Sequence, residues 1–379
     1  MDSKRIVFVL GAGASYGDTL VDIHTGEETH NDIPLINQFF QSDYLFDDTS
    51  KIERSYADLI TYIREAWRIT DPLGTKKWRS LDMEDVFTSL AIQNEFAPPD
   101  SDAKAHAQLL LNSLKRFIQH LIGRRSHSKY GKLTRQLVEG LRVQDSIISF
   151  NYDLLVDEAL IRDQFRDGPQ HYEKFSDKFL GRSFTGVGGR YTFEYHQGLY
   201  LKLHGSLNWF TCSNNFCPNA DQLRILPLTD QALGLSQWGD PVCDYCEGAL
   251  SSYLIPPLLN KPVLRDRIAR NIWSNALSIL SSATKIVVIG YSFPATDFYS
   301  EWLFRMALRG RGNTKVWIVN PLNSLDSQEK DAKKKAAYEA RRTTFIDRLD
   351  NTITTLWGYD STYFRFDQLE DVLASLQTN

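Results

Sequence analysis

The sequence predicts an α/β protein with a doubly wound parallel sheet. Four short apolar runs, at residues 5–10, 146–150, 285–290 and 315–319, are rich in β-branched residues, as strands buried on both faces must be. Helix-like patterns separate the later runs, and strands that alternate with helices form parallel sheets. Glycines follow the first run directly, at positions 11, 13 and 17. The expected fold class is therefore Rossmann-like α/β, with a helical insertion and a small cysteine-bearing module.

The elements of the first half follow from periodicity. The strand over 5–10 leads into the glycine turn and then into a polar, turn-rich loop over 18–35. From about residue 50 to about residue 140, apolar residues recur mostly at spacings of three and four, which predicts helices. A strand over 146–150 and a helix over 153–162 follow.

In the second half, residues 199–204 alternate like a strand, and residues 211–250 are loop-like, with Pro, Asn, Asp and Gly around all four cysteines. Helical and strand patterns then alternate, which continues the α/β arrangement. The expected elements are helices at 267–282 and 298–309, strands at 285–290 and 315–319, a charged, solvated helix within 325–342 and a terminal helix within 366–377.

These elements suggest four parts. Residues 1–35 and 141–325 form the α/β domain, and residues 36–140 form a helical insertion or cap. Residues 211–250 are a small cysteine module within the α/β domain. Residues 326–379 are a C-terminal extension with helix and strand.

Composition excludes several classes of protein. Of the 379 residues, 42% are hydrophobic and 24% are charged, which excludes wholesale disorder. The net charge of −4 argues against a cationic nucleic-acid coat, so no direct nucleic-acid binding is expected. No apolar run reaches the roughly 18 residues that span a bilayer, and the start has no secretory cleavage pattern. We therefore expect a cytoplasmic protein that does not bind membranes.

The four cysteines form two pairs, Cys212-x4-Cys217 and Cys243-x2-Cys246. In a reducing compartment, clustered cysteines point to metal rather than to disulfides. Four thiolates at such spacing suit a closed, tetrahedral, structural Zn²⁺ site. The alternative is a loop with free thiols and no metal.

The glycine turn reads Gly11-Ala12-Gly13-Ala14-Ser15 and continues to Gly17. Glycines after a strand let the backbone approach a pyrophosphate, and the start of the next helix supplies N–H donors. The pattern is GxGxxxG rather than the GxGxxG of dehydrogenases, and no P-loop lysine follows. A tight turn without a ligand is the alternative.

Polar residues follow four other predicted strands. Each has an ordinary structural explanation, as a helix cap, a hydrogen-bonded histidine or a turn. In open α/β sheets, however, ligands bind beyond the carboxyl ends of the strands, so together these residues favour a nucleotide site. They are Asn151 and Asp153, His204, the segment Gly290 to Asp297 with Ser292, and Asn320.

The ordered motifs resemble the sirtuin family. Gly-Ala-Gly-Ala-Ser at 11–15, Phe-Asn-Tyr-Asp at 150–153, Leu-His-Gly-Ser at 203–206 and Gly-Tyr-Ser-Phe-Pro-Ala-Thr-Asp at 290–297 occur in sirtuin order. They look most like the bacterial sirtuin-like, NAD-cleaving effectors of antiphage defence. A deacylase has Gln-Asn-Ile-Asp where this chain has Phe-Asn-Tyr-Asp, and the segment 251–261 does not read as the peptide clamp of deacylases.

The resemblance implies a role for each matching residue. Gly11, Ala12, Gly13, Ala14 and Ser15 match the turn that holds the cofactor phosphates. Asn151 matches the asparagine beside the nicotinamide ribose, Asp153 the nearby acid and His204 the catalytic histidine. Gly290 and Ser292 match the adenosine-side segment, and Asn320 the asparagine near the adenine ribose. Sirtuins also carry a four-cysteine zinc module shortly after the His-Gly pair.

The function expected from the resemblance is cleavage of NAD⁺ to nicotinamide and ADP-ribose by an NAD⁺ glycohydrolase, with NAD⁺ as substrate and Zn²⁺ as a structural ion. Asn151 would orient water or the ribose hydroxyls, and His204 would be the general base. The alternatives are an NAD-dependent protein deacylase and a non-enzymatic module that binds NAD or ADP-ribose. By analogy the chain would be an antiphage effector that acts as a homo-oligomer or with a separately encoded DNA-translocating ATPase.

Overall fold

The computed structural model describes residues 5–30, 33–35, 38–41, 45, 49–126, 128–142, 144–166, 199–214, 216–226, 241–255, 266–294, 297–311, 314–320, 361–365 and 368–377, with positions 336, 340, 343 and 347. The expected helix within 325–342 and the unassigned stretch near 166–197 lie almost wholly outside these residues. Within the described chain, no helix combines the length and the apolar character that a bilayer crossing requires.

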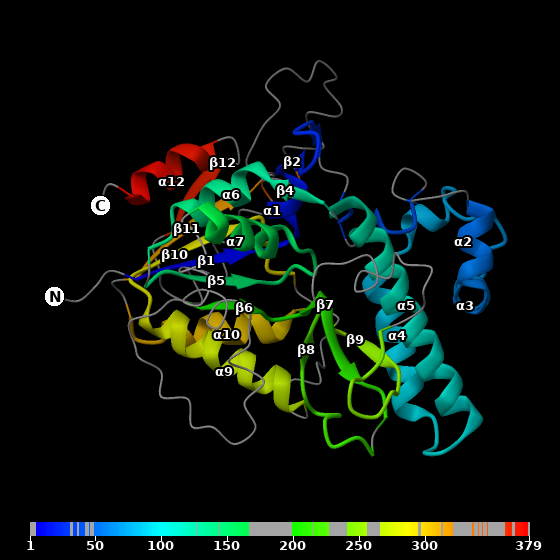
Figure 1. Ribbon diagram of the computed structural model, residues 1–379. Coiled ribbons are helices and arrows are strands. Elements are labelled where there is room, and N and C mark those ends of the chain that lie inside the picture. Colours follow the sequence, from blue (N-terminus) through cyan, green and yellow to red (C-terminus); the bar gives the residue numbers. More distant parts are fainter. Residues whose placement is uncertain are drawn as a thin grey trace.

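A six-stranded parallel sheet forms the centre of the molecule (Figure 1). Its strand order is β12-β11-β10-β1-β5-β6, and every neighbouring pair is parallel. The fold class predicted from the sequence is thereby confirmed. The strands are β1 (Ile6–Leu10), β5 (Ser146–Ser149), β6 (Tyr200–Lys202), β10 (Lys285–Ile289), β11 (Lys315–Asn320) and β12 (Ser361–Arg365).

Helices cover both faces of this sheet because its strands are apolar on both. Val7 and Val9 of β1 face one side and pack with residues of α9 (Arg267–Ser282) and α10 (Phe298–Leu308). Ile6, Phe8 and Leu10 face the other side and pack with residues of α6 (Lys132–Glu139), α7 (Leu155–Arg166) and α12 (Leu369–Gln377). In Figure 1 these two sets of helices lie below and above the sheet. Side chains that alternate between faces thus give two separate cores.

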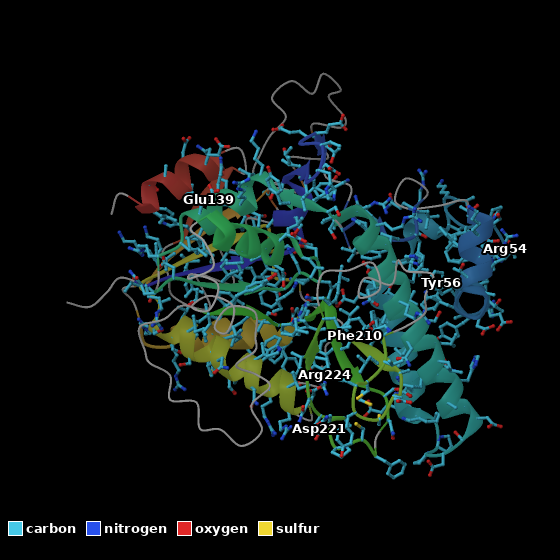
Figure 2. All side chains as sticks on the ribbon, in the orientation of Figure 1. Arg54, Tyr56, Glu139, Phe210, Asp221 and Arg224 are labelled. Carbon is cyan, nitrogen blue, oxygen red and sulfur yellow. The ribbon has the colours of Figure 1, made fainter. Side chains whose placement is uncertain are left out.

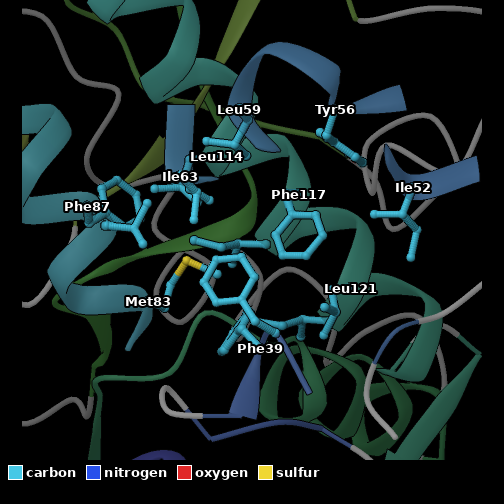
Figure 3. Packing of buried hydrophobic residues seen from close by; sticks show 14 of the residues in the cluster. Phe39, Ile52, Tyr56, Leu59, Ile63, Met83, Phe87, Leu114, Phe117 and Leu121 are labelled. Carbon is cyan, nitrogen blue, oxygen red and sulfur yellow. The ribbon is translucent and has the colours of Figure 1, made fainter. Parts of the chain in front are cut away.

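The helical insertion lies to one side of the sheet and packs around a third cluster of buried residues. It consists of α2 (Thr49–Ser55), α3 (Ala57–Trp67), a 3-10 turn (Trp78–Ser80), α4 (Met83–Phe96) and α5 (Asp102–Ser126). Figure 3 shows its centre, where Phe117 lies near Ile52, Tyr56, Leu114 and Leu121. The same core includes residues of the α/β part, namely Leu154, Leu155, Leu207 and Leu254.

Two small antiparallel sheets correct the expectations for the loops. Residues 18–35 contain β2 (Thr19–Asp22) and β3 (Glu28–His30), which pair with each other, and β2 also pairs with β4 (Lys129–Gly131). Residues 205–254 contain β7 (Gly205–Cys212), β8 (Arg224–Ile225) and β9 (Leu250–Leu254), in the order β8-β7-β9. Both regions are short of uninterrupted apolar residues, which is why they read as loops.

Candidate functional site

The turn after the first strand is held against the carboxyl end of β10. The N–H group of Gly11, which precedes α1 (Ala12–Tyr16), donates to Ile289 O at 3.0 Å, and the N–H of Gly13 donates to Gly290 O at 2.9 Å. A Cβ atom on Gly290, whose φ is +63°, would lie 1.9 Å from the backbone nitrogen of Ala14. The glycines at these positions therefore let two strand ends meet.

This contact bears on the expectation that residues 11–15 hold phosphates. Two of the N–H groups of the turn are engaged by β10, and Ala12 is exposed while Gly13 and Ala14 are half-buried. These glycines thus form a tight turn that packs closely against the end of β10. A tight turn is the alternative that the sequence left open. Phosphate binding by the turn stays a prediction.

Asn151 follows β5 and directs its side chain onto the glycine turn. Its Nδ2 donates to Gly11 O at 3.0 Å and to Ser15 Oγ at 2.9 Å. Because a carbonyl oxygen can only accept, the contact with Gly11 fixes which end of the carboxamide is nitrogen. Ser15 Oγ donates in turn to Asp153 Oδ2 at 2.6 Å. Three of the predicted residues, Ser15, Asn151 and Asp153, therefore share one network.

The carboxamide oxygen of Asn151 is buried and has no hydrogen-bond partner among the described residues. A buried acceptor without a partner costs about 1–3 kcal/mol, and such atoms are normally paired with protein, water or ligand. Asn151 stands where the carboxyl ends of the parallel strands meet, which is where ligands bind in this architecture. Its oxygen is therefore suited to a hydroxyl or amide donor of a ligand.

Asp153 is tied to the start of the helix that follows. Its Oδ1 accepts from the N–H of Leu155, the first residue of α7, at 3.1 Å, so Asp153 has a structural role beside its contact with Ser15. Burial raises the pKa of the Asp153 carboxyl group, although the Lys202 ammonium and the Ser15 hydroxyl act in the opposite direction.

A buried lysine, Lys202, holds the backbone of this loop in place. Lys202, the last residue of β6, is 1% exposed, and its ammonium group donates to the backbone oxygen of Asp153 and to Asp157 Oδ2, the latter at 3.1 Å. Tyr200 OH donates to the same carboxylate oxygen of Asp157 at 3.0 Å. Sequence reasoning missed Lys202, although a lone charge in a strand that is otherwise apolar on both faces is a signal for a buried, paired lysine.

His204 comes two residues after β6 and is 5% exposed. Its Nε2 lies 3.4 Å from Asp297 Oδ2, and the Asp297 side chain is fully buried. Tyr291 OH also donates to that oxygen, at 2.8 Å. Burial raises the pKa of the Tyr291 hydroxyl well above its ordinary value, so it remains a donor. Asp297 thus contacts the predicted catalytic histidine as well as capping α10 through Ser300 N, the role that the sequence suggested.

Aromatic rings connect His204 with the residues around Asn151. The rings of Phe150 and Tyr152, the two chain neighbours of Asn151, lie 5.2 and 6.3 Å from the His204 ring between centroids. Phe150 also stacks on Tyr291 at 4.1 Å. Because β5 and β6 are adjacent and parallel, Asn151 and His204 stand at the same edge of the sheet.

The structure locates only some of the side chains that were predicted to line the adenosine side. Gly290 contacts the glycine turn, and Ser292 is half-buried two residues further on. Asn320 is the last residue of β11, which places its backbone at the same edge, and its side chain lies outside the described part of the chain. The roles of these three residues stay predictions.

The four cysteines meet at one end of the β7–β9 sheet, where sulfur atoms gather in Figure 2. All four sulfur atoms lie within 4.8 Å of one another, with 3.5 Å between Cys212 and Cys246 and 3.9 Å between Cys217 and Cys243. A tetrahedral Zn²⁺ with bonds of about 2.3 Å places its sulfur ligands about 3.8 Å apart, so this donor set fits zinc.

Local structure supports this assignment. The N–H groups of Tyr245 and Cys246 lower the pKa of the Cys243 thiol to about 7, which favours the thiolate that binds metal. Desolvation raises the pKa of the Cys212 and Cys217 thiols, so Cys243 is the ligand that these surroundings favour as a thiolate. Gly248 passes close to the cluster, since a Cβ there would lie 3.2 Å from Cys246 Sγ. The cysteines thus form a compact group rather than a loop of separate thiols.

Comparison with known proteins gives distant structural similarity and no sequence match. No protein-family profile matches the chain, and no curated protein matches it. A solved complex of a Sir2 homologue with NAD is similar, with 13% identity, a TM-score of 0.45 and coverage of 99% of this chain and 89% of that one. A mutant Sir2 homologue with 2′-O-acetyl-ADP-ribose has 14% identity, a TM-score of 0.41 and coverage of 100% and 93%.

Sir2 bound to the inhibitor EX-527, 2′-O-acetyl-ADP-ribose and a deacetylated p53 peptide is also similar, with 12% identity, a TM-score of 0.37 and coverage of 98% and 92%. These neighbours are Sir2 proteins, which are members of the family that the motifs resemble. With TM-scores below 0.5, these similarities assign no function to this chain.

Proposed function

We propose that this chain is an NAD⁺ glycohydrolase that cleaves NAD⁺ to nicotinamide and ADP-ribose. The observation that carries the proposal is the Asn151 carboxamide, held by Gly11 O and Ser15 Oγ, with a buried oxygen that has no partner among the described residues. His204, in contact with Asp297, stands at the same sheet edge. These are the two residues that the sequence motifs single out for nicotinamide–ribose chemistry.

The reaction breaks the bond between the ribose C1′ and the nicotinamide nitrogen. The bonding electron pair leaves with nicotinamide, which becomes neutral, and the ribose takes on oxocarbenium character. Water then attacks C1′ and loses one proton, so the products are nicotinamide, ADP-ribose and H⁺. In this proposal the Asn151 oxygen orients a ribose hydroxyl or the attacking water, because a fixed acceptor lowers the entropic cost of alignment.

His204 would accept the proton that water loses. The carboxylate of Asp297, 3.4 Å from Nε2, stabilises the positive charge that the ring then carries. Phe150 and Tyr291, stacked at 4.1 Å beside this ring, make the surroundings apolar and limit access of bulk water. Asp153, bound by Ser15 and Leu155 N, holds the loop rather than reacting.

The test is quantification of nicotinamide and ADP-ribose after incubation of the purified full chain with NAD⁺. Asn151→Ala and His204→Ala should each lower turnover by about 100-fold or more, the usual contribution of a positioned acid–base group. His106→Ala, which removes an exposed histidine of α5, is the matched control and should retain wild-type turnover. Wild-type rates in both site variants would contradict the proposal.

The same assay separates the alternatives. Formation of acetyl-ADP-ribose that depends on an acylated peptide would indicate a deacylase. Binding of ADP-ribose without turnover, with or without a candidate activator, would indicate a binding module. The assay is therefore run with and without peptide and with the product of the neighbouring gene.

For the biological role, we propose a cytoplasmic effector that depletes NAD⁺ during phage infection, as a homo-oligomer or with a DNA-translocating ATPase encoded nearby. The support is the resemblance of the motifs to the antiphage branch of the sirtuins. Infected cells that carry the wild-type gene should lose NAD⁺, and cells with His204→Ala should not. Native mass measurement of the purified chain, alone and with the neighbouring gene product, tests the assembly.

A further inference from the structure

One face of α10 carries apolar side chains that the fold leaves exposed. Phe298 is 50% exposed and Trp302 is 44% exposed, and Met306, one further turn along the helix, is half-buried. The spacing of four residues places these three side chains in one stripe. In Figure 1, α10 lies below the sheet, beside α9. Exposed apolar side chains that gather in this way mark interaction sites.

The opposite face of α10 fixes the helix to the α/β core. Asp297 caps its start, and its inner side chains pack in the core that includes Val7 and Val9 of β1. The inner side chains that are at most 2% exposed are those of Leu303, Phe304, Ala307 and Leu308. The stripe is therefore held in place before a partner binds, and this reduces the cost of association.

The charges beside the stripe form a pattern that is complementary to itself. Glu301 and Arg305 form an ion pair on one flank of the stripe, with side chains that are 30% and 42% exposed. Position 303 lies midway between the two charges and is next to Trp302, the centre of the stripe. A two-fold axis at this point would exchange the two ends of the stripe and, on the same flank, the two opposite charges.

We propose that this face of α10 is the surface through which two copies of the chain associate, with their α10 helices antiparallel. Trp302 then lies against Trp302 of the second copy, and Phe298 lies against Met306 of the second copy. Along the helix axis, Glu301 of each copy comes within about 3 Å of the level of Arg305 of the other, so ion pairs can form across the interface.

The length of the stripe sets the strength that we expect. From Phe298 to Met306 the helix rises about 12 Å, which is short for the interface of a permanent dimer. The association should therefore be weak and should depend on protein concentration.

This inference gives the homo-oligomer of the proposed function a definite interface, and for its biological role it rests on that function. The residue before the stripe is Asp297, which contacts His204, so the interface would begin beside the candidate site. The experiment below measures mass and not NAD⁺ cleavage. A monomeric chain would thus leave the glycohydrolase proposal standing, and a dimer without NAD⁺ cleavage would leave this inference standing.

The experiment is sedimentation velocity of the purified full chain at increasing concentrations, up to about 200 µM, so that a weak dimer is detected. The wild type should shift from monomer to dimer. Trp302→Glu should weaken dimerisation at least tenfold, because it buries two like charges against each other at the two-fold axis. Leu109→Glu is the matched control, since it places the same charge at an exposed leucine of α5 and should dimerise within twofold of wild type.

A charge exchange tests the antiparallel arrangement. Glu301→Arg places cations of both copies on one flank and should weaken dimerisation at least threefold. Glu301→Arg combined with Arg305→Glu restores the complementary pattern and should return dimerisation to within twofold of wild type. A double variant that dimerises no better than Glu301→Arg would contradict the antiparallel pairing.

The melting temperature of each variant is measured to identify misfolding. If Trp302→Glu lowers it, Trp302→Gln replaces that variant, and a loss of at least threefold is then expected. A wild-type chain that stays monomeric at every concentration overturns the proposal. It is also overturned by a dimer that the Trp302 substitution leaves intact, or by an equal loss in Leu109→Glu.

Discussion

At the residue scale, Lys202 has the surroundings that need most explanation. Its ammonium group is buried yet fully engaged, by Asp157 Oδ2 and by the backbone oxygens of Tyr152 and Asp153. These carbonyls flank the chain just after Asn151, so one lysine fixes the backbone that presents the carboxamide. A buried charge is tolerated when it is paired and hydrogen-bonded in this way.

We expect Lys202→Met to lower the free energy of unfolding by about 3–5 kcal/mol, because it leaves the buried Asp157 carboxylate without its counter-charge. Lys132→Met is the control. It breaks the ion pair with Glu28, in which both side chains are about half exposed, and should lower the free energy of unfolding far less than Lys202→Met does. Urea unfolding measures both, and equal losses would show that Asp157 is not sensitive to its partner.

Some features of the candidate site could be predicted from the sequence, and others could not. The positions of Asn151 and His204 at the sheet edge could be predicted, because each lies two residues after a strand that the sequence identifies. The contact between His204 and Asp297 is not predictable, since it joins residues from two different strand ends and only the folded sheet brings them within 3.4 Å. A helix cap is the ordinary explanation that the sequence offers for Asp297, and Asp297 does cap α10, but its second contact, with His204, requires coordinates.

At the scale of elements, the β1–α1 turn and β10 depend on each other. The Gly290 position is both left-handed in φ and crowded by Ala14. A similar positive φ occurs at Gly310, where a Cβ would meet nothing within 4 Å. Substitutions at the two glycines therefore distinguish the cost of a positive φ from the cost of steric crowding.

Gly310→Ala should destabilise the protein by about 1 kcal/mol, from the left-handed φ alone. Gly290→Ala should cost about 3 kcal/mol or more, because the turn must also move away from the new Cβ. Comparing the urea midpoints of the two variants gives the difference. Equal losses in the free energy of unfolding would mean that the turn can move at little cost and that β10 does not hold it in place.

The cysteine cluster gives a prediction about metal. Purified protein should contain about one zinc per chain by elemental analysis, and Cys243→Ser should contain almost none, since a structural site needs all four ligands. Ser213→Ala, next to Cys212 and hydrogen-bonded only to Ala249 O in the described contacts, should keep its zinc. A zinc content well under one ion per chain in the wild-type protein would show that the four cysteines are free thiols.

Strand prediction succeeded where both faces of a strand are buried. β1, β5, β10 and β11 have almost unbroken apolar runs because helices cover the sheet on both sides. β7 was missed because it carries Ser206 and Asn208, polar yet buried, in place of an apolar run. β2 and β3 were missed because Asp, Thr and Gly dominate a region that is paired only within a small antiparallel sheet.

At the scale of the whole molecule, the helical insertion shares its core with residues at the start of α7 and in the small β7–β9 sheet. Leu154, Leu155, Leu207 and Leu254 are at most 3% exposed and pack in the insertion's core. Gln119 of α5 donates to Leu207 O and accepts from Ser252 Oγ, which ties the same helix to β7 and β9. The insertion is therefore part of the structural unit that holds His204, which lies three residues before Leu207.

Replacing residues 49–126 with a Gly-Ser linker should abolish cooperative folding. It uncovers four leucines, and each fully buried leucine contributes about 1.5–3 kcal/mol, a total comparable with the whole stability of a domain. Near-UV circular dichroism and thermal unfolding of the shortened chain provide the measurement. A cooperative transition with native-like signal would show that the α/β part folds alone.

The position of β1 has a consequence for how the polypeptide is made. This strand occupies the middle of the sheet, with Val7 opposite Ser146 on one side and Ile286 on the other. During translation, β1 leaves the ribosome on the order of tens of seconds before β10 exists to pair with it. Its five buried apolar residues must wait through that interval, so biosynthesis of this chain should depend on chaperones that shield a newly emerged segment.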